Sequence, residues 1–242
     1  MDYKIILYLF FGILPSLTWL AYYMSKDMHP EPKKTILRIF LWGALSTIPV
    51  FFVQIGLMVL LAKADLDPLT TSIIYWFLVI SLTEEFFKYL IVRLKVQNSK
   101  DMDEPLDIML YMVVSALGFA ALENILYLFT PASGLSLNQL LQQTVIVSFI
   151  RFVGATFLHT LCSAVIGYFM ALSFFHPKRS MLYMPLGFFI AVLLHGLFDF
   201  SIIKIEGYEV LVIPGLLLLI VGFLTFLGFE RLKKIKSVSI IK

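Results

Sequence analysis

The sequence predicts an all-α, polytopic integral membrane protein with about seven transmembrane helices and a buried polar site formed by the third to sixth of them. Hydrophobic residues make up 60% of the 242 residues, charged residues make up 14%, and the mean hydropathy is +0.92. A soluble domain of this size carries roughly 25% charged residues. We therefore exclude a soluble enzyme and expect the lipid bilayer, and no nucleic acid, as a partner.

Seven apolar runs reach the length of about 20 residues that a helix needs to cross a bilayer. They lie at residues 4–24, 37–61, 70–93, 107–129, 146–172, 182–203 and 208–229. The first has no convincing small-residue cleavage site, so we interpret it as a retained span rather than a signal peptide. The uncharged segment Thr130–Gln143 is expected to be a polar loop, with its Leu-rich end as a short interfacial turn. Short connections predict one membrane-embedded domain over residues 1–242.

Positive charges are distributed unevenly among the connections. Fourteen of the nineteen Lys and Arg residues follow spans one, three, five and seven, and only Lys4, Lys63 and Lys204 lie on the other side. Because cytoplasmic loops are enriched in Lys and Arg, we expect a multi-pass protein of the cell membrane, with the amino terminus outside and the carboxyl terminus in the cytoplasm. Lys88 and Arg151 fall within spans, and we interpret Arg151, which lies near the outer border and is long enough to snorkel, as a structural or lipid-facing residue.

The third span carries ionisable residues where a bilayer tolerates few. Glu84 and Glu85 stand about 100° apart on a helix, with Ser81 and Lys88 inside that arc. Each charge near the bilayer centre costs roughly 2.5–3.5 kcal/mol, so such residues are functional candidates by default. Three charges within five positions require partners on other helices.

The next three spans each supply polar residues at a similar depth. His195 and Asp199 are spaced i,i+4 and therefore share one helix face. In span order, the candidates are Phe119, Glu123 and Asn124, then His159, then His195 and Asp199. This convergence predicts one site.

The charges of this cluster do not balance. Four carboxylates (Glu84, Glu85, Glu123 and Asp199) face two cations, Lys88 and Arg151, so a net negative charge would remain in a low-dielectric environment. Protonation of a carboxylate, protonation of a histidine, or a bound divalent cation would remove it. A carboxylate can then serve as a general base towards water, and Zn²⁺ held by histidine and carboxylate can activate water.

A resemblance to a known family rests on four motifs, each on its own span. They are Glu84-Glu85-x-x-Lys88, Phe119-x-x-x-Glu123-Asn124, His159 and His195-x-x-x-Asp199. This ordered set resembles the PrsW family of membrane-embedded endopeptidases, which is related to the CAAX-processing and bacteriocin-processing membrane proteases. The segment Asp27-Met28-His29-Pro30-Glu31-Pro32 matches a stretch that the family has after its first helix. The resemblance extends from about residue 15 to 205.

The resemblance implies a hydrolase that cuts membrane-anchored proteins, with anti-sigma-type regulators as the implied substrates. It places the catalytic base among Glu84 and Glu85. His159 and His195 would orient water or stabilise the oxyanion, and Asp199 would fix an imidazole or the substrate amide.

The remaining residues of the four motifs have supporting roles in this hypothesis: Lys88, Phe119, Glu123 and Asn124. We interpret Lys88 as a counter-ion that keeps one glutamate ionised, and we favour Glu85 as the base.

A metal-free mechanism that requires no cofactor is preferred, because the chain lacks the His-Glu-x-x-His helix that commonly binds zinc. If Zn²⁺ binds, the expected ligands are Glu85, Glu123, His159 and His195.

Other functions are compatible with the same residues. Buried Glu, His and Asp chains also build proton- or cation-coupled transporters, although the chain lacks the repeat that many transporters show. An inactive homologue that scaffolds membrane proteins is a third hypothesis. Nothing favours a thiol mechanism at Cys162, the single cysteine. The oligomeric state and the cleavage sequence are not predicted.

Overall fold

The chain forms a bundle of helices, as its composition predicts. The structure, a computed structural model, describes residues 3–26, 29, 31–96, 104–129, 136–204, 207 and 209–234, and these residues contain no β-strand. The elements are α1 (Tyr3–Met24), α2 (Lys33–Ala62), α3 (Pro68–Ile74), the π-helical η1 (Tyr75–Leu82), α4 (Thr83–Lys95), α5 (Pro105–Leu128), α6 (Leu137–Val153), α7 (Ala155–Phe175), the 3₁₀ turn η2 (Pro177–Arg179), α8 (Ser180–Lys204) and α9 (Glu209–Leu232).

Within the described ranges, six helical runs are long and apolar enough to cross a membrane. The expected span 70–93 is helical but is not one of the six, because it is divided among α3, η1 and α4 and carries the charges of the polar site. The expected fifth span is longer than predicted, since α6 and α7 form one run of 39 residues that breaks only at Gly154.

The predicted loop Thr130–Gln143 is wrong in its second half. Helix α6 begins at Leu137 because Ser136 and Gln139 form a capping box, each side chain binding the other's backbone N–H. Residues 130–135 lie outside the described part of the chain, as do Asp27, Met28 and Pro30 of the segment after the first helix.

Helix α5 lies at the centre of the bundle. In the apolar 18-residue stretch of this helix, 94% of the residues are buried. The helix packs against α1, α2 and α7. Two glycines allow α2 and α5 to cross closely: a Cβ at Gly118 would lie 2.0 Å from the Phe40 carbonyl oxygen, and one at Gly43 would lie 2.2 Å from that of Ser115. Helix α2 also packs against α4, which in turn contacts α5.

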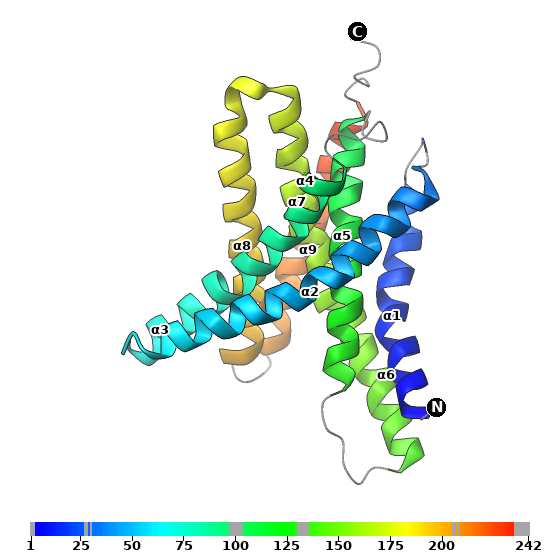
Figure 1. The fold of residues 1–242 in the computed structure, drawn as a ribbon, viewed down its shortest axis with the longest axis vertical. Helices are drawn as coiled ribbons and strands as arrows, with labels where there is room; N and C mark the ends of the chain where they lie inside the picture. Colours follow the sequence, from blue (N-terminus) through cyan, green and yellow to red (C-terminus); the bar gives the residue numbers. More distant parts are fainter. Residues whose placement is uncertain are drawn as a thin grey trace.

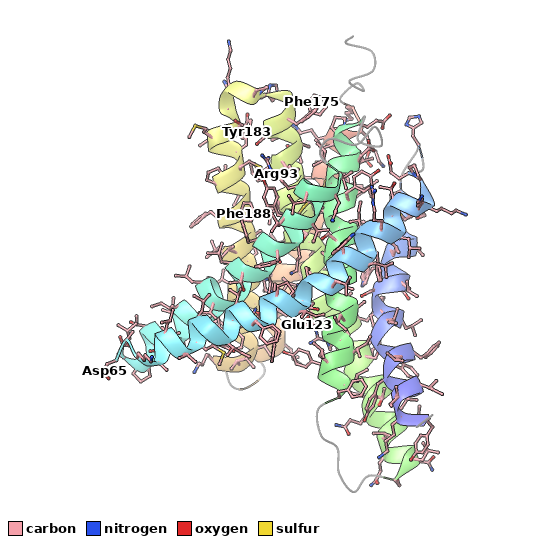
Figure 2. All side chains as sticks on the ribbon, in the orientation of Figure 1. Asp65, Arg93, Glu123, Phe175, Tyr183 and Phe188 are labelled. Carbon is pink, nitrogen blue, oxygen red and sulfur yellow. The ribbon has the colours of Figure 1, made fainter. Side chains whose placement is uncertain are left out.

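The pair formed by α2 and the α3–η1–α4 run lies obliquely across the other helices (Figure 1). Asp65, at its tip, projects away from the bundle (Figure 2). Asp67 begins α3 by accepting from the Leu69 and Thr70 N–H groups. A hydrogen bond from the Thr70 side chain, followed by these backbone bonds, lowers the pKa of its exposed carboxyl. The ends of α1, α4 and α9 with their basic residues lie toward the same end of the molecule (Figure 1), which is the end expected to be cytoplasmic.

Candidate active site

A π-helical segment positions the two adjacent glutamates. Hydroxyl groups stabilise the unusual backbone, since Ser81 Oγ donates to the Trp76 carbonyl at 2.6 Å and Thr83 Oγ1 donates to that of Val79 at 2.6 Å. The regular helix α4 resumes at Thr83, so Glu84 and Glu85 lie in its first turn. Segments of π-helix occur frequently at functional sites.

Glu85 is fully buried and its two oxygens are both hydrogen-bonded. Its Oε1 lies 2.8 Å from Lys88 Nζ and 2.9 Å from His195 Nδ1, and its Oε2 accepts from Ser163 Oγ at 3.0 Å. Lys88 is equally buried, and its ammonium lies 4.5 Å from the centre of the Phe119 ring. Glu85 thus joins α4 to α7 and α8 as an ion-paired carboxylate.

His159 lies between a cation and a carboxylate. Its Nδ1 is 2.7 Å from Lys88 Nζ, and its Nε2 is 2.9 Å from Glu123 Oε2. Because an ammonium can only donate, Nδ1 accepts and Nε2–H donates to Glu123. The Phe119 ring contacts the imidazole edge to face, with centroids 5.7 Å apart.

Arg151 binds the polar pair on α5. It contacts Glu123 Oε2 at 2.7 Å, donates through Nε to Asn124 Oδ1 and packs on the Tyr127 ring at 3.9 Å. Asn124 in turn donates to Thr156 Oγ1 at 3.0 Å. Of the two roles expected for Arg151, structural or lipid-facing, the structure supports the structural one: its side chain is 10% exposed and pairs with Glu123, whose side chain is 22% exposed.

Glu84 differs from Glu85 because only one of its two carboxylate oxygens is hydrogen-bonded. Gln54 Nε2 donates to its Oε1 at 3.3 Å, whereas its buried Oε2 has no hydrogen-bond partner among the described residues. That oxygen lies 3.8 Å from His195 Nε2, 3.9 Å from His159 Nδ1 and 3.6 Å from Lys88 Nζ. The imidazoles of the two histidines lie 5.0 Å apart, nearly perpendicular.

The donor atoms of Glu84, His159 and His195 lie within 4.8 Å of one another, close enough to share one metal ion. Two nitrogen donors and one oxygen donor are the kind of set that zinc enzymes use. His195 can offer Nε2, because its Nδ1–H donates to Glu85. The His159 atom that faces Glu84 is Nδ1, which would have to exchange its contact with Lys88 Nζ for the metal. The donor set therefore suits a divalent metal and includes Glu84, where the sequence suggested Glu85 and Glu123.

Asp199 is the outermost predicted residue. Its Oδ2 lies 3.4 Å from His195 Nε2, and its side chain is 23% exposed. The structure thus brings together all nine residues predicted for the site: Glu84, Glu85, Lys88, Phe119, Glu123, Asn124, His159, His195 and Asp199. They come from the third to sixth predicted spans, as expected (Glu123 is labelled on α5 in Figure 2).

A cavity of about 530 Å³ adjoins the cluster, and Glu84, His159, His195 and Asp199 are among its lining residues. A second cavity of about 300 Å³ lies on the α2 side. The two share four lining residues, which are Gln54, Glu84, Glu123 and Tyr127.

Sequence analysis missed Gln54, which lines both cavities and binds Glu84. The signal for it was a single amide within the long apolar run of the second span.

The chain is similar to known proteins over most of its length. Residues 31–228 match the model of the "PrsW family intramembrane metalloprotease". The chain is 29% identical over 230 residues to Protease PrsW of Oceanobacillus iheyensis, covering 95% of this chain and 96% of that protein. It is 32% identical over 230 residues to Protease PrsW of Geobacillus kaustophilus, covering 93% and 89%, and 27% identical over 233 residues to that of Bacillus subtilis, covering 96% of each.

No solved structure matches the chain. The relatives confirm the family that the motifs suggested and do not favour a transporter. The chain belongs to the PrsW family of intramembrane metalloproteases and is therefore a membrane-embedded peptidase.

Proposed function

We propose that the protein hydrolyses peptide bonds of a membrane-anchored protein substrate in the cavity beside Glu84. One observation carries this proposal: the unpartnered Oε2 of Glu84, which faces both imidazoles and lines the 530 Å³ cavity. A general base must lie within reach of the water that it activates, and here Glu84 meets that condition. Glu85 is less suited, because its oxygens already hold Lys88, His195 and Ser163. We therefore assign the base to Glu84.

We further propose that, in a metal-bound form of this site, Glu84, His159 and His195 would hold a divalent ion, with Zn²⁺ as the first candidate, and Glu84 would then be a ligand instead of the base. Such an ion would supply the activated water and would polarise the carbonyl of the scissile bond. Glu85 fixes the His195 ring through Nδ1, and Glu123 fixes the His159 ring through Nε2. Lys88 keeps Glu85 ionised.

The substrate segment is proposed to enter from the end of the bundle that lies away from the basic residues. Tyr127 and Ile202, which line the cavity, belong to the last turns of α5 and α8. On the other side, the middle of α5 from Met109 to Leu117 is completely buried and closes the site. With the amino terminus outside, cleavage occurs in the outer half of the cell membrane.

The test is co-expression with a tagged single-span anti-sigma-type protein. Glu84→Gln is expected to lower cleavage by about 10²-fold or more while the protein stays monodisperse in detergent. Asp65→Asn, at the exposed tip of the α2–α3 connection, is the matched control and should cleave like the parent. Parental cleavage by a well-folded Glu84→Gln variant would overturn the assignment. Ion-dependent flux in proteoliposomes without any cleavage would instead support the transporter hypothesis.

A further inference from the structure

A second concave site lies on the face of α7 that points away from the catalytic cluster. It is a groove of about 370 Å³ between α1, α7 and α9. Phe157, on its floor, is two residues from His159 and therefore about 200° around the helix from it. Trp19 stacks on Phe157 with centroids 4.4 Å apart, and Tyr23 stacks on Phe229 at 5.9 Å. The walls are thus aromatic and apolar.

The groove has the length of one bilayer leaflet. Along α9 it extends from Gly222 to Lys233, just past the end of the helix, which is twelve residues and so about 16 Å of helix rise. Half of a hydrocarbon core that is about 30 Å thick measures about 15 Å. A lipid acyl chain lying along the groove would therefore place its headgroup beside Lys233.

The mouth of the groove is positively charged. The ionisable groups that line it are Lys26, at the end of α1, and Lys233 and Glu230, at the end of α9. Glu230 pairs with Lys233 at 2.9 Å, whereas Lys26 is exposed and lies over the Tyr22 ring at 5.1 Å. Two cations against one carboxylate favour an anionic headgroup, and basic pockets between membrane helices are known to bind such headgroups.

We propose that the groove binds an anionic glycerophospholipid, with its acyl chain along Phe157 between α1 and α9 and its phosphate at Lys26 and Lys233. The lipid would bridge two helices that flank α7, the helix that carries His159. This site is independent of the proposed peptidase chemistry.

The experiment uses native mass spectrometry of the delipidated full chain in detergent, titrated with phosphatidylglycerol, phosphatidylcholine or inorganic phosphate. Phosphatidylglycerol is expected to bind about tenfold more tightly than phosphatidylcholine, and the double variant Lys26→Gln, Lys233→Gln should lose that preference. The charge-matched control Lys178→Gln, Arg179→Gln, on η2, should keep it.

A second pair of variants tests the acyl chain. Gly222→Leu fills the groove, since its Cβ would lie 3.5 Å from Phe157, and should reduce binding at least tenfold. Gly215→Leu, on the same helix with open space around it, should not. Equal binding by both double variants or by both glycine variants would overturn the proposal. So would saturation by phosphate alone, or a stable dimer that excludes lipid.

Discussion

Lys88 Nζ lies 2.8 Å from Glu85 Oε1, less than one helical turn away on α4, and neither side chain is exposed. This ion pair lets the glutamate stay charged inside the bilayer, where an unpaired carboxylate would be strongly disfavoured. It also divides the roles of the adjacent glutamates, because only Glu84 keeps a buried oxygen without a hydrogen bond from the described residues.

Replacement of Lys88 by Met should destabilise the protein by about 3–5 kcal/mol, because it leaves Glu85 charged and buried without its cation. Lys95→Met, on the same helix, removes a half-buried lysine that packs on Trp42 and should cost less than about 1 kcal/mol. Equilibrium unfolding in mixed micelles measures both. Equal effects of the two substitutions would contradict a stabilising ion pair.

Arg151→Gln should lower the free energy of unfolding by about 1.5–3 kcal/mol, because Glu123 and Asn124 lose a charged hydrogen-bond donor. The matched control is Arg93→Gln, which changes an exposed arginine at the end of α4 and should have little effect. The same micelle titration compares them. If Arg151→Gln left the free energy of unfolding unchanged, the contacts of Arg151 with α5 would contribute nothing to stability.

Gly118→Ala should destabilise the α2–α5 crossing by about 3 kcal/mol or more, because the added methyl would clash with the Phe40 carbonyl. The helix backbone cannot move aside as the end of a flexible side chain can. Gly56→Ala, on α2 with open space around it, should instead stabilise the helix by about 1 kcal/mol. Thermal unfolding in detergent should show opposite signs for the two variants. A shared sign would show that the crossing is looser than the structure indicates.

Metal content should depend on the three donors. The parent is expected to hold one divalent ion per chain, and His195→Ala should reduce this at least tenfold because a ligand is lost. His176→Ala, which changes an exposed histidine at the end of α7, should leave the metal content unchanged. Elemental analysis of the purified proteins measures this directly. Equal metal in both variants would exclude His195 as a ligand.

Much of the candidate site was predictable because charges are rare in apolar spans. Glu84, Glu85 and Lys88 stood out in the third span, and the polar residues of the next three spans supplied their partners. The same reasoning left Arg151 undecided between a structural and a lipid-facing role, because depth along a helix does not say which neighbour a side chain meets. Gln54 was missed because a single neutral amide costs less in a membrane than a charge and so attracts less attention.

The sequence by itself determined the helical class, the approximate spans and the residues of the polar cluster, since each follows from local hydropathy and spacing. Only the tertiary structure decided which glutamate hydrogen-bonds to Lys88 and which keeps an oxygen that faces both histidines without a hydrogen bond. Adjacent residues on a helix differ by about 100° in direction, and the packing of α5, α7 and α8 around α4 determines what lies in each direction. The π-helical η1 also changes the direction in which Glu84 and Glu85 point relative to the start of the run, and a regular helical period does not predict that change.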